Sequence, residues 1–312
     1  MGSAEYDTEK ILIADACSAG GFMYNDEVQK TLRKLQLAEL NIIKLFMKIC
    51  EKEHLRYFMI GGTMLGAIRH KGFIPWDDDV DIGMPREDYD RLFELLKDGT
   101  YLPENFEFLN YKIKDDYKRY FSRIVDNRVL VYNASGGEEI VEAAWIDIFP
   151  LDGSPNNYIL RNLRYTWIMW KRLRYHLSLM DTMVNLNRPG RPLYQRLIIG
   201  FAKRVPIGRG RDCKQILDNI DKELKKYRWA GSSTAANVFG AYAHREMVPK
   251  DVWGSKLALY PFEDVELPGP ENYDAFLSRF YGEYMTPPPE GNRDKHNIRK
   301  IEFLSPENGE DT

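Results

Sequence analysis

Two aspartates that stand two positions apart carry the strongest chemical signal in this sequence. Asp79 and Asp81 lie in an acidic run that follows the Gly61-Gly62 pair. In an extended strand alternate side chains share a face, so both carboxylates can point the same way while Val80 enters the core. Carboxylates held this close repel each other unless a cation sits between them, and their hard oxygen atoms suit Mg²⁺ or Mn²⁺. The pair therefore predicts metal-dependent phosphate chemistry.

A third carboxylate, Asp147, lies in an apolar segment, residues 143–150, that we predict to be a strand. A buried carboxylate is costly without a partner, and metal-dependent phosphoryl transfer commonly uses two or three acids around one or two Mg²⁺ ions. We therefore assign Asp79, Asp81 and Asp147 as catalytic and metal-binding residues. Two alternatives are a solvated acidic loop and a calcium loop, although Ile82 stands where a calcium loop requires glycine.

The Gly61-Gly62-Thr63 turn is the predicted phosphate site. Residues 57–60 predict a short buried strand, and residues 63–69 predict the start of a helix. The unpaired N–H groups and the dipole of such a helix start favour negative charge. The other interpretation is that the glycine pair is only a turn. We expect backbone N–H groups and the threonine hydroxyl to donate to phosphate.

Three basic residues are further candidates for substrate contact. His70 and Lys71 follow the glycine turn closely, and Arg123 stands two residues beyond Phe121 on a predicted strand. An arginine there could reach a diphosphate, and an exposed strand arginine is the equal alternative.

The elements that must position these residues are read from hydrophobic spacing. The pattern predicts helices over residues 27–53, 86–97, 157–211 (with breaks), 212–228 and 273–284, strands over 106–111, 119–125 and 128–132, and an irregular segment over 239–252. A turn at Asp126-Asn127 is expected to join the second and third of these strands.

Charge is unevenly distributed. Residues 159–211 hold twelve Lys or Arg and one acid, Asp181, and sum to +11, whereas the whole chain sums to −3. Such a block suggests an anionic partner, and Trp167 and Trp170 interleaved with basic residues resemble an interfacial membrane helix. The alternative is an internal helix with a solvated basic face. We expect no nucleic acid partner, because no binding motif accompanies the charge.

The composition is ordinary for a globular protein of 312 residues, and the cysteines and apolar segments indicate its cellular compartment. Three cysteines without a C-x-x-C pair predict neither a disulfide framework nor a zinc site, and favour a reducing cytosol. Residues 11–23 lack a basic flank and contain Asp15, which argues against a signal peptide. No stretch reaches the roughly 18 apolar residues that span a bilayer. We expect a cytoplasmic protein, peripheral at the inner face of the cell membrane.

Several segments together resemble the LicD family, whose members include phosphocholine transferases and relatives of the fukutins. The resemblance lies in Gly61–Ala67, Ile74–Gly83, Trp145–Asp152, and Tyr273–Met285 with Pro287, Pro288, Arg293 and His296. It covers about residues 30 to 300, and Arg293 and His296 become candidate substrate contacts through it.

The resemblance implies an α/β (α+β) fold, with a nucleotidyltransferase-like mixed sheet flanked by helices and a mostly helical, basic C-terminal half. It suggests the following division: an N-terminal extension (1–25), a catalytic core (26–156), a helical part packed on that core (157–305) and a mobile tail (306–312).

The implied activity is transfer of a phospho-alcohol from a CDP-linked donor to a sugar hydroxyl of a cell-surface glycan, such as teichoic acid or lipopolysaccharide. The glycan would be lipid-linked, and CMP would be released. Asp79 and Asp81 would hold Mg²⁺, and Asp147 would complete the metal shell or accept the hydroxyl proton. Phosphocholine from CDP-choline is the leading candidate, with phosphoethanolamine, glycerol phosphate and ribitol phosphate open.

Two other classes of function fit parts of the pattern. A metal-dependent glycosyltransferase also uses a D-x-D motif to bind a nucleotide-sugar, although the glycine turn and Asp147 argue against it. A non-catalytic scaffold at the membrane surface would use the basic helices alone.

Overall fold

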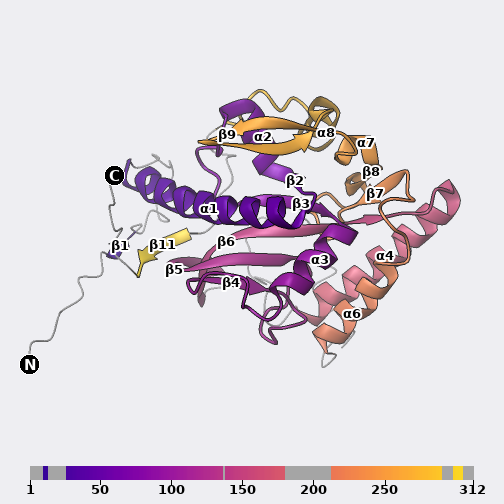
Figure 1. The fold of residues 1–312 in the computed structure, drawn as a ribbon, viewed down its shortest axis with the longest axis horizontal. Coiled ribbons are helices and arrows are strands. Elements are labelled where there is room, and N and C mark those ends of the chain that lie inside the picture. The colour runs from indigo at the N-terminus through magenta and orange to yellow at the C-terminus, as the bar shows by residue number, and fades with distance from the viewer. Residues whose placement is uncertain (1–9, 13–25, 136–137, 180–211, 290–297, 305–312) are drawn as a thin grey trace, which may run out of the picture.

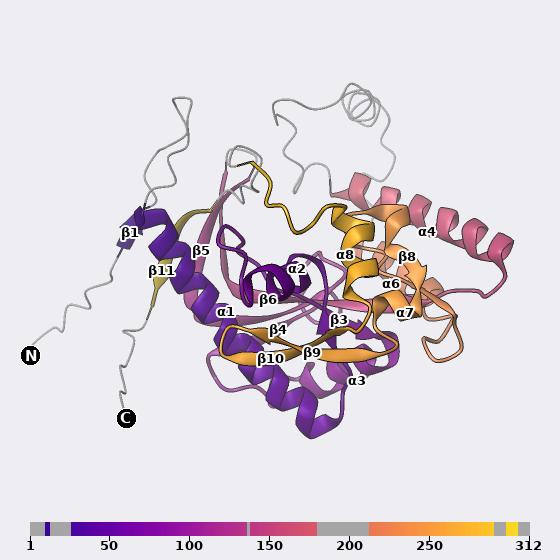
Figure 2. The ribbon, with the colours of Figure 1, turned by 90° about the horizontal axis from the view of Figure 1, so that it is seen from above.

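A mixed β-sheet forms the centre of the protein (Figures 1 and 2). The computed structural model describes residues 10–12, 26–135, 138–179, 212–289 and 298–304. Within these residues nine strands pair in the order β1-β11-β5-β6-β3-β2, with β4 added on β5, and β7 and β8 extending from β6. The strands are β1 Lys10–Leu12, β2 Phe58–Met59, β3 Asp81–Pro85, β4 Phe106–Leu109, β5 Ser122–Ser135, β6 Glu138–Gly153, β7 Thr234–Ala236, β8 Met247–Pro249 and β11 Ile298–Phe303.

The sheet is mixed because β3 runs parallel to β6 while the other described pairs are antiparallel. The middle of β6 is apolar apart from Asp147: Ile146 and Ile148 are fully buried, and Trp145 and Phe149 nearly so. A strand covered on both faces reads as a continuous apolar run. The predicted fold class is confirmed.

Two helices pack against the sheet (Figure 1). The N-terminal half of α1 (Asp26–Glu53) buries Leu35 with Val125 and Trp145. Its C-terminal half, which includes Phe46, shares a second buried cluster with Leu92 of α3 (Arg86–Leu96) and with Ile124. The short helix α2 (Gly61–His70) lies between β2 and β3 in the chain.

The C-terminal part combines helices with short strands. It contains α4 (Tyr158–Ser178), α6 (Cys213–Leu224), the 3₁₀ turn η1 (Ala243–Glu246), α7 (Lys250–Trp253), the hairpin β9 (Leu257–Phe262) and β10 (Val265–Pro270), and α8 (Tyr273–Tyr281). The helices α4 and α6 lie side by side at one end of the sheet, and the hairpin lies near α2 (Figures 1 and 2). Strands β7 to β11 were not predicted from the sequence.

The predicted turn at Asp126-Asn127 is wrong. Residues 122–135 form one continuous strand, β5, whose register with β6 shifts between Asp126 and Leu130. The Asp126 carboxylate accepts from the backbone N–H of Arg128 at 3.0 Å, and the Asn127 N–H donates to the Asn105 carbonyl at 2.9 Å. The side chain thus stabilises a bulge that bends the strand without reversing it.

Some predictions fall outside the described residues. These are the N-terminal extension apart from residues 10–12, the tail 306–312, the basic block beyond residue 179, and both Arg293 and His296.

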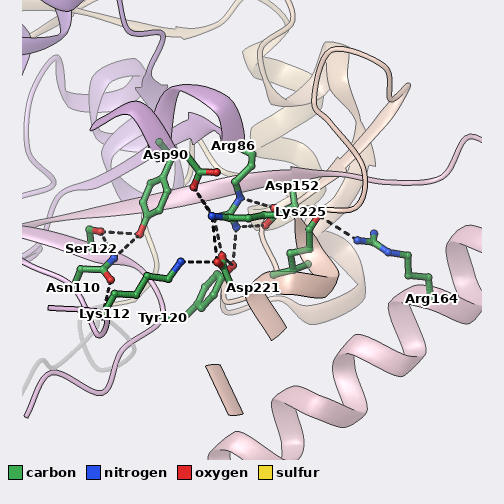
Figure 3. Close-up of polar contacts among 12 residues, drawn as sticks. Arg86, Asp90, Asn110, Lys112, Tyr120, Ser122, Asp152, Arg164, Asp221 and Lys225 are labelled. Carbon is green, nitrogen blue, oxygen red and sulfur yellow. Dashed lines mark hydrogen bonds and ion pairs between the residues drawn. The ribbon is translucent and has the colours of Figure 1, made fainter. Parts of the chain in front are cut away.

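A buried ion-pair network joins the C-terminal helices to the sheet (Figure 3). Arg86, the first residue of α3, donates to both oxygens of Asp152 on β6, at 2.7 and 2.8 Å. It also donates to Asp221 of α6 at 3.2 Å and to the Tyr120 hydroxyl at 2.7 Å. Lys112 donates to the second oxygen of Asp221 at 2.6 Å. Every charge in this set has an opposite partner, which is the condition for burying it.

Candidate functional site

A cavity of about 720 Å³ gathers five of the residues that the sequence assigned to chemistry. Gly61 and Gly62 reach it from the start of α2, Asp79 and Asp81 from the acidic loop and the start of β3, and Asp147 from β6. The structure therefore brings three distant segments to one place. The chemical roles of these residues stay predictions.

The two glycines allow carboxylates to lie directly against the backbone. Gly61 has φ +56°, and a Cβ on it would stand 2.5 Å from an Asp81 carboxylate oxygen. A Cβ on Gly62 would stand 2.6 Å from a carboxylate oxygen of Asp77. No side chain fits at either position without displacing an acid. The start of α2, where the helix dipole favours negative charge, thus faces the acidic loop.

A hydrogen bond from its backbone N–H holds Asp81 in position. It is the first residue of β3, so Asp79 lies just before the strand and not within it as predicted. The Asp81 N–H donates to the Thr63 hydroxyl oxygen at 2.8 Å. Thr63 is buried and is not among the residues that line the cavity. Its hydroxyl therefore positions Asp81, and its predicted donation to phosphate stays a prediction.

The parallel pairing of β3 with β6 sets Asp81 opposite Asp147. The Asp147 N–H donates to the Val80 carbonyl at 2.8 Å, which locks this register. Burial raises the pKa of Asp81 well above its ordinary value, and the neighbouring charges of Asp79, Asp147 and Asp77 raise it further. The cavity wall therefore concentrates negative charge that a bound cation would relieve.

Asp147 is held by an arginine. The Arg123 Nε donates to one carboxylate oxygen of Asp147 at 2.5 Å, and its Nη2 approaches the other at 3.4 Å. Arg123 also donates to Glu142 at 2.9 Å and lies over the Trp145 ring, 4.2 Å from the ring centroid. Arg123 is thus buried against Asp147, so the alternative of an exposed strand arginine is wrong, whereas its contact with a diphosphate stays a prediction.

One face of α2 lines the cavity. Gly61, Leu65 and Arg69 recur every four residues, which puts them on one stripe of a helix. Arg69 is therefore the basic residue of α2 at the cavity, and its Nη1 donates to the Tyr284 carbonyl at 2.8 Å. His70 and Lys71 end the helix and do not line the cavity, and Lys71 is exposed. Contact of these two residues with substrate stays a prediction.

The opposite wall of the cavity was missed by the sequence analysis. It comes from the segment 237–246, of which residues 239–246 were predicted only as irregular, and from α8 with the residues that follow it. Its members include Asn237, Phe239, Gly240, Tyr242, Glu246, Phe280, Tyr281 and Tyr284. A single carboxylate in a short aromatic loop has no spacing that marks it as functional, so the sequence offered no usable signal.

Glu39 of α1 is a buried carboxyl beside the acidic loop. Both of its oxygens lack a hydrogen-bond partner among the described residues. Burial, followed by the charges of Asp78 and Asp79, raises its pKa well above the ordinary value. Its surroundings therefore favour the neutral form of Glu39 over the ionised one.

Asp79 and Asp81 fit a hard divalent cation. Both carboxylates reach one cavity, and Gly61 leaves space against the oxygen of Asp81. Carboxylate oxygens are the ligands that Mg²⁺ and Mn²⁺ prefer. Within the described residues no three His, Cys, Asp or Glu side chains are arranged as a ready-made metal site. The ion pair of Asp147 with Arg123 is consistent with this, because it engages both oxygens of the third acid.

The fold and the site define a class of protein: an α/β nucleotidyltransferase-type domain with carboxylates on two adjacent parallel strands beside a glycine turn. The LicD/FKTN/FKRP nucleotidyltransferase domain matches residues 54–177. The chain is also 30% identical over 288 residues to the lipopolysaccharide cholinephosphotransferase LicD of Haemophilus influenzae, an alignment that covers 88% of this chain and 98% of that protein. The chain belongs to the LicD family, which confirms the resemblance drawn from the sequence.

Two other relatives match smaller parts. An uncharacterized protein of Rickettsia prowazekii is 31% identical over 142 residues, which is 45% of this chain and 44% of that protein. The human ribitol 5-phosphate transferase FKRP is 50% identical over 40 residues, which is 13% of this chain and 8% of that protein.

Proposed function

We propose that this protein is a metal-dependent phosphotransferase that moves a phospho-alcohol from a CDP-alcohol to a sugar hydroxyl of a cell-surface glycan and releases CMP. The observation that carries the proposal is the meeting of Asp79, Asp81 and Asp147 with the glycine turn in one cavity. Phosphocholine is the leading candidate for the transferred group, because the relative aligned over most of the chain is a cholinephosphotransferase.

In the proposed reaction the glycan hydroxyl oxygen bonds to the phosphorus that bears the alcohol. The bond from that phosphorus to the oxygen of CMP breaks, CMP leaves with the electron pair, and the hydroxyl proton passes to a carboxylate of the cavity. The backbone N–H groups at Gly61 and Gly62 and the guanidinium of Arg69 are positioned to meet phosphate oxygens.

Asp79 and Asp81 are the residues that would hold Mg²⁺ or Mn²⁺. The ion, when bound, would neutralise the diphosphate and the charge that develops on the leaving CMP. Asp147 adjoins them through the pairing of β3 with β6, and Arg123 of β5 holds both of its carboxylate oxygens.

Nucleotide release tests this proposal against the nucleotide-sugar alternative. Purified protein with MgCl₂ is incubated with CDP-choline, CDP-ethanolamine, CDP-glycerol, CDP-ribitol and a panel of UDP-sugars, with and without a lipid-linked glycan fraction. CMP release that requires the metal supports phospho-alcohol transfer. UDP release in place of CMP release would establish a glycosyltransferase. If neither nucleotide is released, and if an Asp79→Ala variant binds nucleotide as the wild type does, the non-catalytic scaffold is favoured.

We also propose that the protein works at a membrane surface through α4. Ile159, Leu163, Trp167, Trp170 and Leu173 form an exposed apolar stripe on this helix. The side chains of Lys171 and Arg174 lie over the rings of Trp167 and Trp170. Apolar rings flanked by cations suit an anionic lipid interface. No helix in the described part of the chain is both long and apolar enough to cross a bilayer.

A further inference from the structure

Aromatic rings form one corner of the cavity that the glycine turn also lines. The ring centroid of Tyr242 lies 5.4 Å from that of Phe280 and 5.8 Å from that of Tyr281, and the planes of the two tyrosines are inclined at 83°. All three residues line the cavity. The negative faces of aromatic rings attract a cation that has no hydrogen-bond donors, and three such rings line this part of the cavity.

A buried carboxylate adjoins these rings. Glu246 is 5% exposed, lines the cavity, and accepts from the Tyr242 N–H at 3.1 Å. Gly240 makes room for it, because a Cβ there would stand within 2.3 Å of a carboxylate oxygen. Burial raises the pKa of Glu246 to about 7. Such a group gains from a cation in the same space, which would stabilise its ionised form.

The cations of the protein near Glu246 do not neutralise it. Arg172 and Arg279 lie close enough to lower its pKa, but each donates to a backbone carbonyl, that of Val238 at 2.9 Å and that of Arg245 at 2.8 Å. Among the described residues no ion pair to Glu246 occurs. The carboxylate of Glu246 is therefore available to pair with a cationic group of a bound ligand.

The aromatic corner and the acidic wall lie within reach of one ligand. Tyr242, Phe280, Tyr281 and Glu246 line the same cavity as Gly61, Gly62 and Asp81. A ligand with a phosphate at the glycine turn can thus extend a short chain toward the rings. The three rings together with the buried carboxylate of Glu246 suit a cationic group at that end.

We propose that Tyr242, Phe280, Tyr281 and Glu246 form a subsite for a quaternary ammonium group, so that the transferred alcohol is choline. This inference rests on the proposed function, because it assigns the alcohol end of the same donor. It also separates choline from glycerol and ribitol by residues that the sequence did not mark.

Calorimetric titration with CDP-choline and with its neutral isostere, CDP-3,3-dimethylbutanol, tests the subsite in the presence of MgCl₂. The two ligands have the same shape and differ in the positive charge. We expect CDP-choline to bind about tenfold more tightly or better. Equal affinities, or tighter binding of CDP-glycerol, would overturn the subsite. Metal-dependent CMP release from CDP-glycerol would then leave the proposed function standing, whereas failure of every CDP-alcohol to bind would overturn both.

Three variants assign the discrimination to residues. Tyr242→Leu and Glu246→Gln should each bring the ratio of the two affinities toward one, while Tyr242→Phe, which keeps the ring, should retain it. Tyr158→Leu, at an exposed position on α4, is the matched control. Thermal unfolding checks that each variant is folded. A Glu246→Gln variant that weakens both ligands equally would show that the carboxylate does not recognise the charge, and would contradict the proposal.

Discussion

Asp81 lies where the glycine turn, β3 and the strand of Asp147 meet, so its substitution should separate chemistry from folding. We expect Asp81→Asn to lower CMP release on the order of a hundredfold or more, because a metal ligand is lost. In metal-free buffer its melting temperature should not fall, since one of several like charges is removed. The rise in melting temperature that MgCl₂ gives the wild type should be absent.

The control for this prediction is Asp115→Asn, which changes a carboxylate that is 98% exposed. It should keep both turnover and the response to MgCl₂. If Asp81→Asn retained the wild-type rate and the wild-type response, Asp81 would have no part in metal binding or turnover.

Gly61 offers a second residue-scale prediction, because a matched glycine exists. Gly61→Ala places a Cβ against Asp81, whereas Gly99, also at positive φ (+75°), has nothing within 4 Å of such a Cβ. Both alanines carry the same kind of backbone strain, about 1 kcal/mol. We expect both variants to lose a similar amount of stability in urea unfolding, with an additional loss of CMP release of at least tenfold only in Gly61→Ala.

Equal activity of the two alanine variants would show that the close approach of Asp81 to Gly61 does not matter for turnover. An unfolded Gly61→Ala would instead show that the approach is needed for the fold itself.

At the residue scale the sequence led to the acids but not to all of their neighbours. Asp79, Asp81 and Asp147 could be named because carboxylates in apolar, strand-like segments demand a partner. The choice of His70 and Lys71 followed nearness in sequence, whereas helix geometry brings Arg69 to the cavity. Glu246 and Tyr242 could not be named, because only the folded chain brings their loop to the cavity.

At the scale of a single element, the exposed face of α4 predicts binding to lipid. Trp167 and Trp170 are 50% and 48% exposed and stack at 5.7 Å. We expect the wild type to co-float with vesicles that contain anionic lipid, and less so in 0.5 M NaCl, because salt screens the basic side chains (~3–5 Å Debye length). The double variant Trp167→Ala/Trp170→Ala should bind at least tenfold more weakly, because both rings leave the interface.

Leu259→Ala is the control, since it removes an apolar side chain that is 62% exposed on β9 and far from α4 in the chain. It should leave vesicle binding unchanged. A wild type that stays with the vesicle-free fraction at low salt would show that the apolar face of α4 meets something other than lipid.

Helices with strong hydrophobic periodicity were predicted well from the sequence. Strands, which form only by pairing with another strand, were predicted less well. The pattern of α1 gave its extent almost to the residue, because one apolar stripe continues over its whole length. The strands β7 to β10 are only three to six residues long, so their sequences carry too little pattern, and β7 also depends on pairing with β6, which lies far away in the chain. The bulge in β5 was mistaken for a turn, since Asp-Asn favours both.

At the scale of the whole molecule, the site depends on how strands are ordered. The parallel pairing of β3 with β6 makes Asp81 the neighbour of Asp147 although 66 positions separate them in the sequence. Composition and periodicity do not specify which strands become neighbours or in what register. The family resemblance supplied the expectation that Asp147 joins Asp79 and Asp81 in one site. The pairing of β3 with β6 gives this expectation a physical basis.

The network around Arg86 ties the C-terminal helices to this sheet, and its strength should depend on pH. Burial alone would raise the pKa of Asp221, but Arg86, Lys112 and Lys225 outweigh it and lower the pKa to about 2 from the ordinary 3.8. A lowered pKa stabilises the folded state at pH values above 3.8, and this stabilisation is lost as the pH falls toward 2. The shift corresponds to about 2 kcal/mol at neutral pH, of which about half should be lost by pH 3.

Urea unfolding of the wild type and of Asp221→Asn at pH 7, 5, 4 and 3 measures this contribution. The wild type should be more stable by about 3 kcal/mol at pH 7 and 5, because removing one partner leaves buried cations uncompensated. The difference should shrink between pH 4 and 3, as Asp221 of the unfolded wild type takes up its proton. Asp218→Asn, at an exposed position on the same helix, should show no such trend. A difference between wild type and Asp221→Asn that stays constant down to pH 3 would mean that the network holds α6 by packing, and that its charges contribute little to joining the two parts of the molecule.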